Sequence, residues 1–197
     1  MSGIILAGGK SERMGGSKAD LELGGRRLLE WVAEALREVC GELLVVSPRP
    51  LARLPAGTRW VCDEPAGCGP LGGLYAGLNA AREELNFVAA CDTPFLRLEL
   101  IKGLLELAGG WQVVVAKGED GLHPLCGVYA RSCREAIGRA LAAGERRVRS
   151  FYPQVQVRLV EAGELRGFDP DLVSLININT PEELARAETL VGLLSSR

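Results

Sequence analysis

The fold of this chain is decided by the stretch Ile4-Ile5-Leu6-Ala7-Gly8-Gly9-Lys10-Ser11-Glu12-Arg13-Met14-Gly15-Gly16-Ser17-Lys18. Its apolar beginning predicts a buried strand that breaks at once into a glycine-rich loop. Ligands of α/β proteins bind beside loops that follow the carboxyl ends of parallel strands. Glycines let backbone N–H groups approach a phosphate closely, and the cations Lys10, Arg13 and Lys18 can neutralise its charge. The stretch therefore predicts a nucleoside triphosphate site, with a flexible loop carrying solvated cations as the plain alternative.

The composition predicts one globular domain, residues 1–197, in the cytoplasm. Hydrophobic residues make up 47% of the 197 residues, which is enough for a full core. No apolar run approaches the roughly 18 residues of a membrane-spanning helix, and glycines and charges follow the first apolar run too soon for a signal peptide. A net charge of −2 argues against nucleic acid as a partner but not against a small anionic ligand.

The cysteine and histidine content argues against a zinc site. There is a single histidine and no Cys-x-x-Cys pair. We expect reduced thiols that fill core space. The six cysteines are Cys40, Cys62, Cys68, Cys91, Cys126 and Cys133.

Strand-like and helical patterns alternate along the chain. The strands are expected at residues 3–7, 42–47, 59–62, 87–91, 112–116, 125–130, 155–160 and 175–178. The helices are expected at residues 27–40, 71–85, 98–108, 132–142 and 181–194. Such alternation predicts a three-layer α/β/α fold with a mostly parallel sheet, and residues 112–130 read as a hairpin-like, antiparallel insertion.

Two acidic residues follow predicted strands. Asp92 ends the apolar run Phe87–Cys91 and precedes a proline, so its hard oxygens could hold Mg²⁺ against a triphosphate. An Asx turn or a helix cap is the alternative role for Asp92. Asp63 likewise ends a strand, before a glycine-rich segment in which Pro70 suits the first turn of a helix whose N-terminus could bind an anion. The glycines fit tight helix packing equally well, but packing leaves Asp63 without a role.

Three further features remain after these motifs. Asn177 and Asn179 are expected to point the same way on an apolar strand, and buried amides need partners such as a metal or a ligand hydroxyl. His123 fits a structural role better than a catalytic one. The basic run at residues 146–149 is either a solvated helix face or a second phosphate site, and we expect an acceptor substrate near His123 and this run.

Five motifs, in order over residues 3–184, resemble those of the molybdenum cofactor guanylyltransferases. The opening pattern L-A-G-G-x-S-x-R-M-G-x-x-K matches residues 6–18 throughout. The others are G-P-L-x-G-L at 69–74, C-D-T-P at 91–94, H-P-L-x-G-V-Y at 123–129 and N-I-N-T-P-E-x-L at 177–184. The opening loop is not a G-x-G-x-x-G sequence, and no Walker A sequence is present, which disfavours simple dehydrogenases and P-loop proteins.

The resemblance implies a Rossmann-like, glycosyltransferase-A-like nucleotidyltransferase. It implies transfer of GMP from GTP to the phosphate of molybdopterin carrying molybdenum or tungsten, with release of pyrophosphate, and Mg²⁺ or Mn²⁺ as the cofactor. Proteins of the molybdenum cofactor pathway are the implied partners. The implied nucleotide contacts are Leu6, Ala7, Gly8, Gly9, Lys18, Ser47, Asp63 and Asp92. The implied catalytic residues are Arg13, Lys18 and Asp92, and the implied metal ligands are Asp92 and Asn179.

One departure from the family's pattern and one comparison with related enzymes bear on this assignment. Ser47 stands where many members of the family have asparagine, and its shorter hydroxyl can make fewer nucleotide contacts. Relatives that use CTP tend to read L-A-A-G and D-I-D-T-P where this chain has L-A-G-G and N-I-N-T-P, which favours GTP. A cytidylyltransferase, another nucleotidyltransferase, and an adaptor that binds a nucleotide without turnover are the alternatives.

Overall fold

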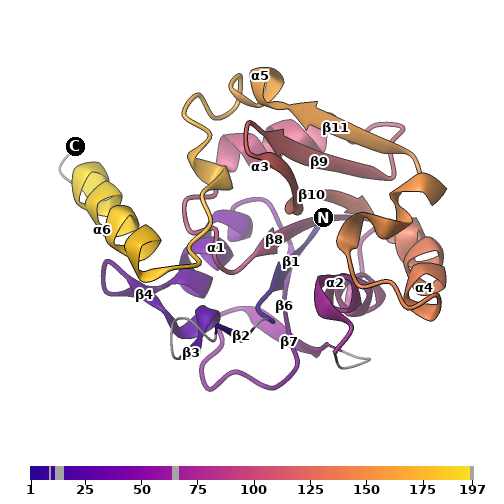
Figure 1. Cartoon of the computed structure of the whole chain (residues 1–197), viewed down its shortest axis with the longest axis horizontal. Helices are drawn as coiled ribbons and strands as arrows, with labels where there is room; N and C mark the ends of the chain where they lie inside the picture. The colour runs from indigo at the N-terminus through magenta and orange to yellow at the C-terminus, as the bar shows by residue number, and fades with distance from the viewer. Residues whose placement is uncertain (9, 12–15, 64–66, 196–197) are drawn as a thin grey trace.

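A computed structural model of the chain describes residues 1–8, 10–11, 16–63 and 67–195. Its centre is a seven-stranded sheet in the order β11-β9-β10-β8-β1-β6-β7 (Figure 1). The strands are β1 (Ser2–Leu6), β6 (Glu42–Ser47), β7 (Thr58–Cys62), β8 (Leu85–Ala90), β9 (Val113–Gly118), β10 (Gly121–Ala130) and β11 (Val157–Glu161). Only β10 runs antiparallel to its neighbours in this sheet, β8 and β9, so the sheet is mostly parallel, as the sequence predicts.

Helices cover both faces of the sheet and confirm the predicted three-layer α/β/α architecture (Figure 1). One face packs against α1 (Leu28–Arg37), α3 (Leu98–Glu106) and α5 (Ala162–Leu165). The other packs against α2 (Gly69–Ala80), α4 (Arg134–Ala142) and the 3-10 helix η3 (Val148–Gln154). The central strand β8 serves both cores, because Phe87 and Ala89 pack on the first face and Val88 packs on the second.

A smaller apolar cluster joins the N-terminal part of the chain to its last helix. The short strands β4 (Glu22–Leu23) and β5 (Arg26–Arg27) pair as a hairpin that packs against α6 (Pro181–Ser195). The carboxylate of Glu188 on α6 accepts the backbone N–H of Gly24, which has a φ of 60° at the hairpin turn. This contact anchors α6 beside the short helix η1 (Lys18–Asp20), which precedes the hairpin. A second short pair, β2 (Lys10–Ser11) with β3 (Gly16–Ser17), lies in the opening loop.

The predicted strand at residues 175–178 is wrong. The 3-10 helix η4 (Val173–Leu175) ends there, and the segment that follows joins no sheet. The reason is that β1 and β8 already have a neighbouring strand on both sides, so the segment cannot pair with them. It passes the carboxyl end of β8 instead. Its backbone is held there because the N–H of Ile178 donates to the carbonyl of Asp92 at 2.9 Å.

The connections between the strands place a ligand site at the carboxyl ends of the central strands β1 and β8. From β1 the chain passes to β6 and β7 on one side, and then returns through α2 to β8 on the other side. Such a reversal leaves a crevice at the carboxyl ends of the strands, where α/β proteins bind ligands. None of the helices in the described ranges is long and apolar enough to cross a membrane.

Candidate active site

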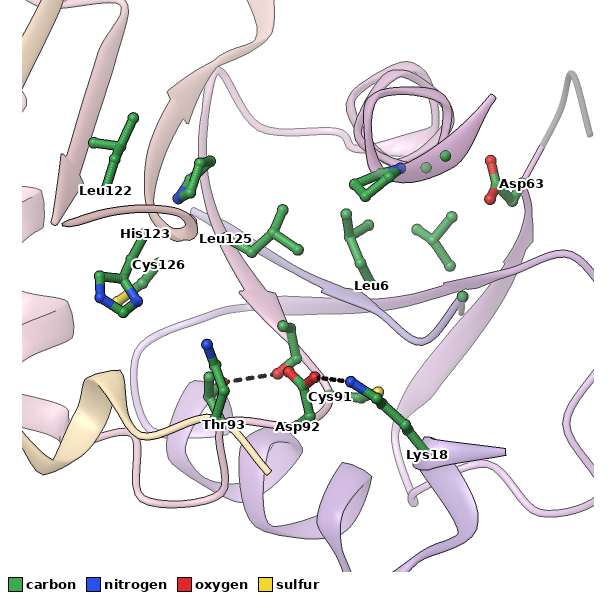
Figure 2. A pocket seen from close by; sticks show the side chains of 18 of the residues that line it. Leu6, Lys18, Asp63, Cys91, Asp92, Thr93, Leu122, His123, Leu125 and Cys126 are labelled. Atoms are coloured by element: carbon green, nitrogen blue, oxygen red, sulfur yellow. Dashed lines mark hydrogen bonds and ion pairs between the residues drawn. The ribbon is translucent and has the colours of Figure 1, made fainter. Parts of the chain in front are cut away.

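A cavity of about 740 Å³ opens at this reversal. It is lined by residues that follow β1, β7 and β8 and by the first turn of α2, and its far wall comes from β10. Figure 2 shows Asp63 and His123 on opposite sides of the cavity, with Lys18 and Asp92 together on a third side. The cavity therefore presents three different chemical environments.

Lys18 and Asp92 line the cavity and meet Asn179 at its side, and we call these three residues the lysine cluster. The ammonium nitrogen of Lys18 lies 2.8 Å from Oδ2 of Asp92, and it also donates to Oδ1 of Asn179. The side chains of Lys18 and Asp92 are only 22% and 14% exposed. Residues separated by 74 and 161 positions along the chain thus converge on one ammonium group (Figure 2 shows the Lys18–Asp92 pair).

Hydrogen bonds from the residues on either side of Asp92 fix the position of its carboxylate. Asp92 directly follows β8, and the N–H of Cys91 donates to the carbonyl of Leu6 at 3.1 Å. Thr93 closes the turn through its hydroxyl, which donates to the carbonyl of Ala90 at 2.8 Å. The turn explains why Asp92 points into the cavity rather than along the strand.

A helix cap fixes the amide side of the same cluster. Glu183 accepts the backbone N–H groups of Asn179 and Thr180 at 2.6 and 3.1 Å, and its own N–H donates to the Thr180 hydroxyl at 3.2 Å. This is the capping box that the T-P-E-E sequence predicts. The first turn of α6 therefore sets the position of Asn179.

The oxygen donors of the lysine cluster fit a hard divalent cation. Asp92 and Asn179 offer a carboxylate and an amide oxygen, which are ligand types that Mg²⁺ accepts. Mg²⁺ is usually held by one or two carboxylates together with substrate phosphates rather than by a complete protein cage. The described residues contain no group of three or more His, Cys, Asp or Glu able to hold a metal.

Asp63 forms a second polar centre, at the end of β7. Its Oδ1 atom is buried and has no hydrogen-bond partner in the described structure, and burial raises the pKa of this carboxyl. Its Oδ2 atom would lie only 3.5 and 3.7 Å from Cβ atoms built on Gly8 and Gly73. The carboxylate therefore faces a gap that the two glycines keep open, and an unpaired buried oxygen favours a ligand that donates hydrogen bonds to it.

The remaining nucleotide-contact candidates of the opening strand take different positions. Leu6 and Gly8 line the cavity. Ala7 is buried, and its backbone N–H donates to the carbonyl of Val46 at 2.8 Å, so the sheet already uses that donor. Gly9 and Arg13 lie outside the described residues.

Ser47 is engaged within the protein. Its side chain is buried, its hydroxyl donates to the carbonyl of Arg49 at 2.7 Å, and it accepts the indole N–H of Trp60 at 3.0 Å. The cavity is lined at this position by the neighbouring Pro48. In this structure the Ser47 side chain therefore braces the β6–β7 edge beneath the cavity.

The wall opposite Asp63 comes from the β9–β10 hairpin. His123 lines it, and its Nε2 atom lies 2.8 Å from Oδ1 of Asp120, whose pKa is lowered chiefly by this hydrogen bond. Asp120 was missed by sequence reasoning, although its spacing of three residues from the single histidine was a usable signal. Apolar side chains of Leu122 and Leu125 complete this wall.

Asn177 and the basic run flank the cavity differently. Asn177 lines it, but from an irregular segment and not from the expected strand. The run at residues 146–149 is largely exposed and forms a loop and the start of η3 rather than a helix face. Its Arg146 carbonyl would lie 3.4 Å from a Cβ on Gly69, which lines the cavity with a φ of 63°. The run thus lies beside the beginning of α2, at the rim of the cavity.

Comparison with known proteins gives concordant results over nearly the whole chain. A protein from Desulfosudis oleivorans named molybdenum cofactor guanylyltransferase is 41% identical over 196 residues, covering 97% of this chain and 96% of that protein. One from Pelotomaculum thermopropionicum, named probable molybdenum cofactor guanylyltransferase, is 39% identical over 189 residues, covering 96% and 92%.

A solved structure and a family description agree with these relatives. The crystal structure of molybdopterin-guanine dinucleotide biosynthesis protein A from Archaeoglobus fulgidus has a TM-score of 0.84 and 29% identity, covering 98% of this chain and 100% of that one. Residues 3–159 match the family described as the MobA-like NTP transferase domain. The chain therefore belongs to the MobA-like NTP transferase family.

Proposed function

We propose that this chain transfers GMP from GTP to the phosphate of molybdopterin, which carries molybdenum or tungsten, and releases pyrophosphate. The observation that carries the proposal is the lysine cluster, which shares one cavity with Asp63, whose Oδ1 atom has no donor among the described residues, and with the wall of Leu122, His123 and Leu125. A transferase that joins a nucleotide to a second phosphate needs these three parts: a base site, a phosphate site and an acceptor site. The names of the relatives point to the same pair of substrates.

Asp63 is the group that selects guanine in this proposal. The Watson–Crick edge of guanine carries two adjacent donor groups, N1–H and the 2-amino group, and a carboxylate only accepts hydrogen bonds. Cytosine and adenine offer one amino group beside an acceptor nitrogen, so they would leave one Asp63 oxygen facing a lone pair. A site built around a buried polar group rejects ligands that leave it unpaired.

Lys18 binds the triphosphate near the transferred phosphorus. An ammonium group beside a phosphate offsets the charge that develops on the leaving pyrophosphate, and such positioned charge supplies most of the rate in phosphoryl and nucleotidyl transfer. Mg²⁺ or Mn²⁺, held by Asp92 and Asn179 together with phosphate oxygens, would supply further neutralisation of the same charge. Arg13 is proposed to add a second cation from the opening loop.

The acceptor phosphate itself is the nucleophile. One of its oxygens attacks the α-phosphorus of GTP, the new P–O bond forms as the bond to the bridging oxygen breaks, and pyrophosphate leaves with the electron pair. A phosphate monoester is already anionic near neutral pH, so the protein need not supply a general base. The residues then act by placing the two substrates in line.

The direct test offers GTP, CTP, ATP and UTP separately, each with Mg²⁺ and molybdopterin, and measures pyrophosphate and the dinucleotide product. We expect product with GTP alone or in large excess. Preferential use of CTP would identify a cytidylyltransferase and overturn the proposal. Nucleotide binding without product from any of the four would favour the adaptor alternative, with Mn²⁺ substituted for Mg²⁺ as the control for metal choice.

A further inference from the structure

Strand β10 has an irregularity in its pairing where it reaches the cavity. Its pairing with β9 shifts between His123 and Gly127, because His123 is opposite Ala116 and Gly127 is opposite the adjacent Val115. On its other side, pairing with β8 begins only at Cys126. Pro124 and Leu125 consequently pair with neither neighbouring strand, and both line the cavity. We call Pro124 and Leu125 the β10 bulge.

Two phenols hold the β10 bulge from behind. The hydroxyl of Tyr129, which is fully buried, donates to the carbonyl of Pro124 at 2.5 Å. It also lies 2.7 Å from the hydroxyl of Tyr152 on η3. A hydroxyl has a single proton to donate, so Tyr129 accepts from Tyr152 and the order is Tyr152 to Tyr129 to the Pro124 carbonyl.

The chain of phenols lies outside the cavity itself. Neither Tyr129 nor Tyr152 lines it, and Phe151 packs edge-on against Tyr152 with ring centroids 5.1 Å apart. We call the hydrogen bonds from Tyr152 to Tyr129 and from Tyr129 to the Pro124 carbonyl the relay. Burial raises the pKa of Tyr152 to about 12, so this phenol keeps its proton at neutral pH. The two phenols are thus placed to position the bulge and not to exchange protons with a substrate.

We propose that Tyr152 and Tyr129 are positioning residues that hold the β10 bulge in the shape that receives the acceptor substrate. The bulge belongs to the wall of Leu122, His123 and Leu125, across the cavity from the nucleotide-facing carboxylate of Asp63 (Figure 2). This inference rests on the proposed function, because it assigns the His123 side to the pterin phosphate. It goes beyond that function by naming residues that act on the acceptor without touching it.

The test is Tyr152→Phe, which removes the first hydroxyl of the relay and keeps the ring contacts. We expect the KM for molybdopterin to rise about 3- to 10-fold, the range for one lost hydrogen bond. The affinity for GTP and kcat at saturating molybdopterin should both stay near the wild-type values. Tyr75→Phe is the matched control, because Tyr75 lies on α2 beside Gly138 and has no part in the relay.

Hydrogen exchange supplies a second, substrate-free readout. The backbone amides of Leu125 and Cys126 should exchange faster in Tyr152→Phe and in Tyr129→Phe, but not in Tyr75→Phe. An unchanged KM for molybdopterin in Tyr152→Phe, or an equal loss of GTP affinity, would overturn the positioning role. Failure of the wild-type chain to transfer GMP would instead overturn the proposed function, and this inference with it.

Discussion

The ammonium nitrogen of Lys18 lies 2.8 Å from Oδ2 of Asp92, although 74 residues separate them. In this arrangement the lysine neutralises the carboxylate and also binds Asn179. A triphosphate that enters the cavity brings several negative charges, which compete with Asp92 for the same ammonium group. We expect Lys18 to turn toward the phosphates when GTP binds, leaving the oxygens of Asp92 and Asn179 to the divalent cation.

Asp92→Ala should abolish transfer while leaving the fold intact. The change removes the proposed metal-binding carboxylate, and the loss of one positioned electrostatic group typically lowers kcat by about 10²–10³-fold. The side chain lies in the cavity, so its loss leaves no apolar void in the core. Steady-state kinetics with Mg²⁺ as the only metal, together with a thermal melt, would measure both effects.

The matched control for that variant is Glu99→Ala. Glu99 is an exposed carboxylate on α3, away from the cavity lining. Turnover should stay at the wild-type level in this control. Wild-type turnover in Asp92→Ala would remove Asp92 from the metal site.

Lys18→Ala should weaken GTP binding about 10- to 100-fold, because charge-assisted hydrogen bonds to phosphate contribute roughly 1.5–3 kcal/mol each. Titration calorimetry at two salt concentrations would measure the loss. The exposed Lys102→Ala on α3 is the control with the same change in net charge. Equal affinities for GTP in wild type and Lys18→Ala would place the phosphates elsewhere.

Local patterns predict much of this site, because each acidic residue ends a strand whose hydrophobic run is visible in the sequence. Asp63 and Asp92 both follow strands that form near the expected residues. The meeting of Lys18 with Asn179 has no such local signal. This contact depends on the path of the segment before α6, which is set by the strand order of the completed sheet.

The same limit explains the wrong strand at residues 175–178, and it explains why the β10 bulge could not be predicted within a hairpin that the sequence does predict. An apolar segment with two asparagines has strand character, yet it joins no sheet because β1 and β8 are already paired on both sides. The β10 bulge depends on a register shift and on the distant phenol of Tyr152, neither of which has a periodic pattern. Hydrophobic periodicity therefore predicts the layers but not the cavity wall.

Asp63→Asn should change which base the cavity accepts. The amide carries an NH₂ group where Asp63 has an oxygen. One of the two donor groups of guanine therefore loses its acceptor and faces another donor. We expect GTP affinity to fall by about 10-fold or more. Xanthosine triphosphate carries an oxygen in place of the 2-amino group and should bind the variant better than it binds wild type. Competition binding with both nucleotides would test this, and a variant that lost both equally would argue against base contact.

The same substitution should stabilise the ligand-free protein near neutral pH. Burial raises the folded-state pKa of Asp63 above its usual value of 3.8. Stability from the protonated form is then present below that value and is lost as the pH rises through the folded-state pKa. Asp63→Asn should therefore raise the Tm near pH 7, and the difference should vanish below pH 3.8. Asp120→Asn is the control of opposite sign, because His123 lowers the pKa of Asp120; a higher Tm in both variants would contradict this account.

Gly8→Ala tests whether the gap over Asp63 selects the nucleotide. A Cβ at this position would lie 3.5 Å from Oδ2 of Asp63 and 3.5 Å from Cδ of Pro48, which are ordinary contact distances, so the fold should tolerate it. The methyl group would nevertheless cover the carboxylate from the cavity side. We expect GTP affinity to fall about 10-fold, as for one lost charge-assisted hydrogen bond, while weak CTP binding changes little. Gly109→Ala, a loop position with no atom within 4 Å of the added carbon, is the control. An equal loss for GTP and CTP would show that the methyl group obstructs the phosphates, and base selection would then have to come from another contact.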